Sequence, residues 1–242
     1  SHACRHSVTM VQSLDASLLT VEAGPVKVQG RLVMIGPLVE RTLRGDQVPL
    51  LLVDVEPTHP NFRALLGAVV VQRARVLDHL AFDDLRRTGL AFLSGALGGR
   101  AVDSAVRSAV GELAAKFEAP SSMDARVRWM MDQIQEDPSR SLCSLAEGLG
   151  LSVEHASRLF SSQLGLSLRV YTLSAKIRLA ARYMGRGVSL TEVAQMAGFV
   201  DSAHFTKVWV KCYGAPPSTF FPASRTFMDD TALPGWIRPP EC

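Results

Sequence analysis

The chain has 242 residues, of which 47% are apolar and 20% are charged, and its formal net charge is +3. These proportions are those of a globular protein long enough for two domains, so wholesale disorder is excluded. Its longest apolar run, residues 64–71, is too short to span a membrane, which takes about 20 residues. The four cysteines form no CxxC pair and no secretory signal is recognisable, so we expect a reducing, cytoplasmic location and no membrane partner.

Residues 7–56 predict short strands, because aliphatic and β-branched runs alternate there with glycine and proline. The runs cover residues 17–22, 25–29, 31–35 and 48–56. Strands at this spacing indicate a small antiparallel sheet or barrel. After Pro60 the apolar period becomes helical, and residues 61–117 predict three or four helices.

The last of these helices carries one apolar stripe, which either packs on its own domain or pairs with a second subunit. The stripe consists of Val102, Val106, Ala109, Val110, Leu113 and Phe117, at intervals of three and four residues. The run Ala-Pro-Ser-Ser that follows breaks the pattern. We therefore expect a domain at 1–118, a linker at 119–122, an all-helical domain at 123–222 and a poorly ordered, proline-containing tail at 223–242.

The second half contains an internal repeat with an offset of 48 residues, which becomes 49 after one inserted residue. Its clearest matches are Ser141 with Ser189, Ala146 with Ala194, Gly150 with Gly198, Phe160 with Trp209, and Gly165 with Gly214. Each copy predicts a short helix, a glycine-containing turn and a second helix, which is the plan of a helix-turn-helix.

Side-chain caps support this reading. Ser141 and Ser189 are expected to cap the first helices, and Ser152 and Asp201 the second ones. Ser189 and Glu192 match the S-x-x-E capping box.

The two second helices, 153–163 and 202–212, have apolar inner faces and outer faces rich in basic and hydroxyl side chains. Residues 151–215 hold eight basic and three acidic side chains, a net charge of +5. Such faces suit base edges and phosphates, although an ordinary polar helix surface is the alternative. The duplication favours DNA binding.

Between the two copies, residues 167–184 are apolar on more than one side and predict a buried helix about 27 Å long. Major-groove sites on one face of B-DNA recur about every 34 Å. Such a spacer would place two recognition helices in successive grooves. Basic residues on it are candidates for phosphate contacts.

Residues 123–221 resemble the AraC/XylS family of transcription regulators. The resemblance is carried by Leu145-Ala146, Gly150-Leu-Ser152, Arg158-Leu-Phe160, Gly165, Tyr171, Arg178, Ala181, Val193-Ala194, Gly198-Phe199, Asp201-Ser202, His204-Phe205, Lys207, Trp209, Gly214, Pro217 and Phe220. The chain departs from the family pattern at Val200, Trp209, Val210 and Phe221, and the last two replace basic residues.

The resemblance implies contacts to double-stranded DNA. Base readout falls on Glu154, His155, Ser157, Arg158, Ser202, Ala203, His204, Thr206 and Lys207. Contacts to the DNA backbone are expected from Ser161, Lys176, Arg178, Arg182 and Lys211.

The N-terminal half is similar to the cupin-like sensor domain often fused to this family, which implies effector binding, dimerisation or both. A homodimer would then use Val102, Val106, Val110 and Leu113. The expected fold is α+β: an N-terminal small antiparallel barrel or cupin-like sheet with helices, then an all-α domain of two helix-turn-helix subdomains joined by a long helix.

No nucleotide-binding, nucleophile-elbow or other catalytic motif is present, so we expect neither an enzyme nor a cofactor. His2, Cys4 and His6 alternate but lack further metal ligands. The favoured function is a sequence-specific DNA-binding transcription regulator, with an activator role preferred and with RNA polymerase and a small-molecule effector as further partners. The alternatives are a metal- or ligand-binding cupin-type protein in which DNA binding is secondary, and an N-terminal half that only dimerises or binds a partner.

Overall fold

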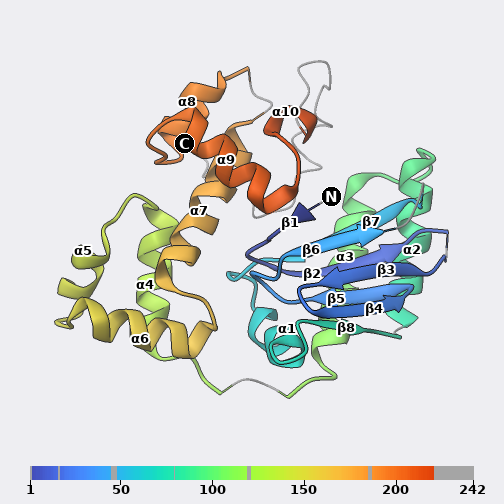
Figure 1. Cartoon of the computed structure of the whole chain (residues 1–242), viewed down its shortest axis with the longest axis horizontal. Helices are drawn as coiled ribbons and strands as arrows, with labels where there is room; N and C mark the ends of the chain where they lie inside the picture. The colour runs from blue at the N-terminus through green and yellow to red at the C-terminus, as the bar shows by residue number, and fades with distance from the viewer. Residues whose placement is uncertain are drawn as a thin grey trace. The chain divides into compact units, whose positions relative to one another are not determined.

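A computed structural model describes residues 2–15, 17–44, 48–78, 80–118, 121–184 and 187–220. The chain divides into two compact units, one built mainly from residues up to Pro120 and the other mainly from Ser121 onward (Figure 1). The expected tail at 223–242 lies outside the described residues, as do two residues of the expected linker.

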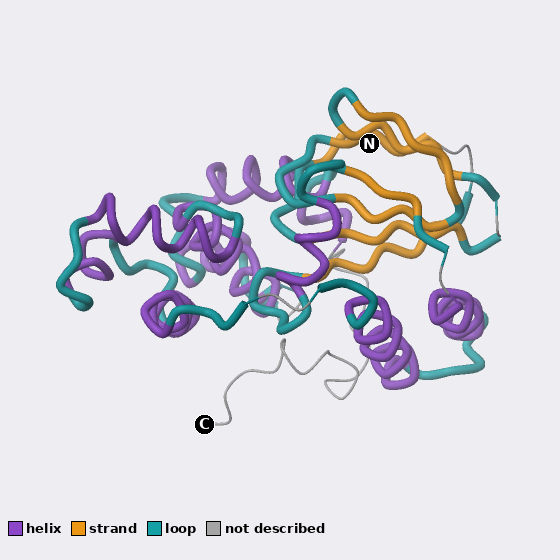
Figure 2. Tube along the Cα trace, turned by 90° about the horizontal axis from the view of Figure 1, so that it is seen from below, coloured by secondary structure: helices purple, strands orange, loops and turns teal. Residues whose placement is uncertain are grey.

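The first unit contains two antiparallel sheets of four strands, followed by helices (Figures 1 and 2). One sheet has the order β1 (His2–Ala3), β6 (Arg41–Arg44), β3 (Leu19–Ala23), β4 (Val26–Gly30). The other has the order β7 (Leu50–Val55), β2 (Val8–Ser13), β5 (Leu32–Ile35), β8 (Ala74–Val76). The helices are α1 (Phe62–Val69), α2 (Leu80–Leu93) and α3 (Gly99–Ala114).

The two sheets pack face to face over one apolar core. Val21 pairs with both Val28 and Leu43 in the first sheet. These side chains join a buried cluster to which Val11 and Val33 of the second sheet also belong. Strand β2 is buried on both faces, because its other face is covered by helices: the Gln12 side-chain amide donates to the carbonyl of Phe82 in α2 at 2.7 Å.

The expected α+β class is confirmed, but the barrel is wrong, because the two sheets do not close on each other. Each keeps two edge strands, β1 and β4 in one and β7 and β8 in the other. Four strands were not among the expected runs. They are β1, the central strand β2, the short and polar β6, and β8, which lies in a stretch expected to be helical. Ala74 joins the sheet only through its pairing with Ile35, a partner distant in the sequence.

The second unit is all-helical, as expected. It begins with α4 (Ala125–Glu136) and continues with α5 (Leu142–Glu147), α6 (Val153–Leu164), α7 (Leu168–Tyr183), α8 (Leu190–Met196), α9 (Ser202–Tyr213) and α10 (Pro217–Phe220). In the described part of the chain, no helix combines the length and the hydropathy needed to cross a membrane.

The close packing of β4 against β8 of the other sheet can be tested at Gly30. A Cβ atom on Gly30 would lie 2.6 Å from one methyl of Val76 and 3.2 Å from the other. Because the second methyl is also close, rotating the valine does not remove the clash. We expect Gly30→Ala to lower the free energy of unfolding by about 1–3 kcal/mol in urea denaturation.

Gly67→Ala is the matched control. Gly67 lies exposed in α1, where an added Cβ meets nothing within 4 Å. This substitution should raise the stability by about 0.5–1 kcal/mol, because alanine is the better helix former. Equal effects of the two substitutions would contradict the described packing of β4.

Candidate nucleic-acid interface

The first helix-turn-helix consists of α5 and α6. The Ser141 hydroxyl caps α5 by accepting from the amide of Ser144 at 3.1 Å, and the Ser152 hydroxyl caps α6 by accepting from the amide of His155 at 3.2 Å. Gly150, in the turn between them, has a φ of 64°, in the left-handed region that favours glycine. The expected caps and glycine turn of this copy are confirmed.

The second copy consists of α8 and α9 and repeats this local chemistry. The Ser189 hydroxyl accepts from the amide of Glu192 at 3.3 Å, and a Glu192 carboxylate oxygen accepts from the amide of Ser189 at 3.0 Å. These two bonds complete the expected capping box. Gly198 has a φ of 77°, and the Asp201 carboxylate caps α9 by accepting from the amide of His204 at 2.6 Å.

The two turns also share a backbone hydrogen bond. The amide of Leu151 donates to the carbonyl of Ala146 at 2.9 Å, and the amide of Phe199 donates to the carbonyl of Ala194 at 2.9 Å. These are residue pairs that the repeat aligns. The internal repeat is therefore one local structure formed twice.

Aromatic residues fill the two small cores at equivalent places. Phe160 is fully buried and meets Tyr171 of α7 edge to face, with ring centroids 5.2 Å apart. Trp209 occupies the matching position in the second copy, with Phe205 at 5.7 Å and Phe220 at 5.9 Å. The indole of Trp209 is thus accommodated inside the second subdomain.

Helix α7 connects the two copies, which lie at its two ends (Figure 1). Its 16 residues span about 24 Å. It packs on α4, α6 and α8, and buried side chains occur along its length, among them Leu168, Tyr171, Ala175, Ile177 and Ala180. The expectation of a buried spacer helix is confirmed.

The residues assigned to base readout lie on the outer faces of α6 and α9. The exposed ones are Glu154, His155, Arg158, Ala203, His204 and Lys207, and the half-buried ones are Ser157, Ser202 and Thr206. The Thr206 hydroxyl donates to the carbonyl of Ser202 at 2.8 Å, and the His204 ring lies edge-on to Phe199 at 5.5 Å. The two helices therefore present short polar and long basic side chains outward.

The residues assigned to phosphate contacts divide into two groups. Lys211 is exposed and Ser161 is half-buried on the recognition helices. The basic residues of α7 are instead engaged within the unit. The Lys176 ammonium donates to the carbonyl of Gly198 at 2.6 Å, and the Arg178 guanidinium donates to the Ser174 hydroxyl at 3.0 Å. Burial, together with Arg178, lowers the pKa of Arg182.

The structural role of Lys176 could not be predicted from the sequence. A basic residue on a spacer helix suggests a phosphate contact, but this ammonium holds the turn of the second helix-turn-helix against α7. Its carbonyl partner is 22 residues away in the sequence, so no local signal identifies it.

The residues assigned to a dimer contact lie in α3 of the first unit. Val110 and Leu113 are each 2% exposed, so their side chains belong to the core of this unit. Val102 and Val106 are half-buried. A second subunit could therefore reach the N-terminal half of this stripe but not its C-terminal half.

Comparison with protein families finds a match in the second unit. Residues 145–223 match the family model of a helix-turn-helix domain. The arabinose operon regulatory protein of Escherichia coli strain K12 is 30% identical over 115 residues, 46% of this chain and 39% of that protein. The transcriptional activator NphR of Rhodococcus sp is 27% identical over 96 residues, 39% of this chain and 28% of that protein. The match thus spans only about a third of these two relatives.

Among solved structures, that of ToxT from Vibrio cholerae O395, bound to (E)-4-(8-methylnaphthalen-1-yl)but-3-enoic acid, aligns with a TM-score of 0.57. The alignment covers 90% of this chain and 91% of that chain at 11% identity, so it shows a shared fold.

The capping box yields a pH-dependent prediction. Hydrogen bonds from the Ser189 hydroxyl and amide lower the pKa of Glu192. The stabilisation is therefore present above the ordinary glutamate pKa and is lost as the pH falls through the lowered value. We expect Ser189→Ala to raise the pKa of Glu192, measured by NMR titration, and to cost about 1 kcal/mol of stability at pH 7.

Ser141→Ala is the control, since Ser141 caps α5 without a glutamate at the third helical position. It should cost a similar amount of stability and leave the pKa of Glu192 unchanged. A titration of Glu192 that does not respond to Ser189→Ala would refute the capping box.

Proposed function

We propose that the second unit of this chain, which matches the model of a helix-turn-helix domain, belongs to the AraC/XylS family, and that the whole chain is a sequence-specific DNA-binding transcription regulator. One observation carries the proposal. Two helix-turn-helix copies lie at the two ends of the buried helix α7. The copies match in their caps, their glycine turns and the hydrogen bonds of those turns.

In this proposal α6 and α9 read successive major grooves of one duplex. The length of α7 is comparable to the groove repeat of about 34 Å once the width of the flanking helices is added. Arg158 and Lys207 suit guanine O6 and N7, and Glu154 suits the amino group of cytosine. Ser157, Ser202 and Thr206 complete the reading faces with hydroxyl groups.

Positioning on the DNA backbone falls to Lys211 and Ser161, whose side chains are accessible. Arg178 and Arg182 lie partly buried along α7, so their phosphate contacts stay a prediction. Lys176 acts indirectly, because its ammonium supports the turn before α9.

For the first unit we propose effector sensing and a contribution to a homodimer. Its fold is shared with ToxT, which in the solved structure holds a small organic acid. A dimer contact on α3 would use its half-buried residues Val102 and Val106. The name of NphR, a transcriptional activator, supports an activator role. A contact with RNA polymerase and a cytoplasmic location are parts of the same proposal.

The metal-dependent alternative finds no support in the described residues, since no three histidine, cysteine or acidic side chains gather there as ligands.

Arg158 tests the base readout. Selection of bound duplexes from a random pool first supplies the cognate site. We then expect Arg158→Ala to weaken binding to that site by about 1–3 kcal/mol in a mobility-shift titration, because a bidentate contact to a base is lost. Binding to random duplexes should change little.

Arg128→Ala is the matched control, because Arg128 is also exposed but lies on α4, outside both helix-turn-helix copies. It should bind the cognate site like the unmodified chain. Unchanged discrimination by Arg158→Ala would mean that α6 does not read bases.

Lys211 tests the backbone contact. We expect Lys211→Ala to weaken cognate and random duplexes equally and to reduce the slope of log affinity against log salt by about one, because one phosphate contact releases about one counterion. A loss confined to the cognate duplex would instead place Lys211 in base readout.

A further inference from the structure

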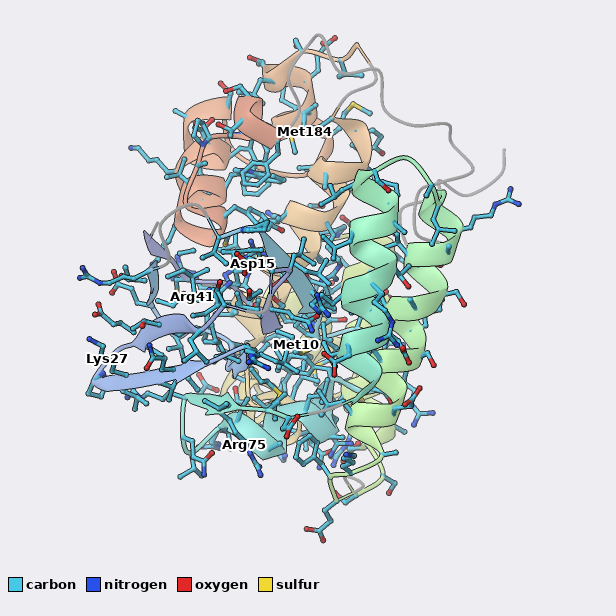
Figure 3. The ribbon with its side chains drawn as sticks, turned by 90° about the vertical axis from the view of Figure 1, so that its right-hand side faces the viewer. Met10, Asp15, Lys27, Arg41, Arg75 and Met184 are labelled. Atoms are coloured by element: carbon cyan, nitrogen blue, oxygen red, sulfur yellow. The ribbon has the colours of Figure 1, made fainter. Side chains whose placement is uncertain are left out.

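Val200 is the most exposed large apolar side chain among the described residues of the second unit. It is 85% exposed, whereas the next in order, Met196, is 49% exposed. Other large apolar side chains of this unit are buried, such as Met184 directly after α7, which Figure 3 labels. Single exposed apolar residues are common on proteins, so the position of Val200 in the fold has to decide its role.

Val200 is the residue by which the second helix-turn-helix copy is longer than the first. The repeat aligns Leu151 with Phe199 and Ser152 with Asp201, which leaves Val200 without a counterpart. The turn bond of Phe199 and the cap at Asp201 form on either side of it, as their equivalents do in the first copy. Since the first copy makes the same turn without this residue, the helix-turn-helix structure does not require Val200.

The side chain of Val200 also lies outside the small core of its subdomain. An apolar residue directly before an N-cap often packs on the fourth helical residue, which in α9 is Phe205. Here Phe205 is buried against Phe199, with ring centroids 5.2 Å apart, and against Trp209 at 5.7 Å. Phe199 therefore takes the place that Val200 would occupy, and a polar residue at position 200 would serve the fold equally well.

The position of Val200 is the end of α9 that meets the bases in the proposed function. In helix-turn-helix proteins the N-terminal residues of the second helix contact base edges. Both chain neighbours of Val200 contact His204, which is assigned to base readout. The Asp201 carboxylate accepts from the His204 amide at 2.6 Å, and the Phe199 ring lies 5.5 Å from the His204 ring. Val200 is thus placed beside the reading face of α9.

We propose that Val200 contacts the C5-methyl group of a thymine in the major groove and makes the second copy select thymine at that base pair. An isopropyl group has no hydrogen-bonding atom, so a phosphate or a polar base edge gains nothing from it. The thymine methyl is the only methyl group that the four bases present in this groove. The inference rests on the proposed function, since it names one more residue of the same DNA interface.

A protein partner fits the observations less well. Surfaces that bind proteins through apolar contacts usually offer a contiguous patch of roughly several hundred Å². Val200 is a single side chain, followed in the sequence by the exposed carboxylate of Asp201. Its size instead matches one methyl group.

Deoxyuridine in place of thymidine removes only this methyl group, so it is the probe for the contact. The full chain is titrated by mobility shift with the cognate duplex obtained by selection. It is then titrated with duplexes in which each thymine is replaced singly by deoxyuridine. We expect one replacement, in the half of the site read by α9, to weaken binding about fourfold, the effect of one methyl group removed from water.

Val200→Ser should weaken binding to the cognate duplex by a similar factor. It should then show no further loss with deoxyuridine at that position, because the contact is already absent. Val200→Ile keeps an apolar side chain and should keep the response to deoxyuridine. Val71→Ser is the matched control, because Val71 is 88% exposed but lies in the first unit, between α1 and β8. It should bind every duplex like the unmodified chain.

The thymine contact is overturned if no single deoxyuridine weakens binding, or if Val200→Ser responds to deoxyuridine as the unmodified chain does. Undiminished DNA binding by Val200→Ser also overturns it and leaves this side chain to a protein partner. In these three cases the unmodified chain still binds its cognate duplex, so the regulator stands. Failure of the full chain to enrich or bind any duplex overturns the regulator itself, and the thymine contact with it.

Discussion

Burial of α7 on several sides is the constraint on which the C-terminal unit depends. A helix pair such as α8 and α9 has too little apolar surface to form a stable core alone, and α7 supplies the missing surface. Tyr171 fills the first core against Phe160, and Lys176 reaches the carbonyl of Gly198 in the second. The spacer is therefore also the structural support that holds each reading helix in place.

In the N-terminal unit the main constraint is the central strand β2, which is buried on both faces. Such a strand brings polar side chains inside, and these need partners. Thr9 finds Asp54 across the sheet, and the Gln12 amide finds α2. The two Nη atoms of Arg41 have no hydrogen-bond partner among the described residues.

The two units thus use cations in two physically distinct ways. Arg158 and Lys207 are exposed, so solvent and salt screen their charges, and in the proposed function they act together in attracting a polyanion. Arg41 is shielded from water, so its charge is screened much less.

Local chemistry in the sequence determined much of the C-terminal unit. Ser141, Ser152, Ser189 and Asp201 act as caps on residues three positions away, and Gly198 adopts a backbone that only its own lack of a side chain makes easy, so these features are readable without a structure. The outward faces of α6 and α9 follow from helical periodicity for the same reason.

Only the tertiary structure decided what depends on distant partners. The open sandwich in place of a barrel, strand β8 at Ala74, the bond from Lys176 to Gly198 and the burial of Arg41 all arise from pairings between residues far apart in the chain. Periodicity reports which face of an element is apolar, but not which surface it meets. The sequence therefore does not distinguish a basic side chain that is exposed to solvent from one that binds a backbone carbonyl or one that lies inside a core.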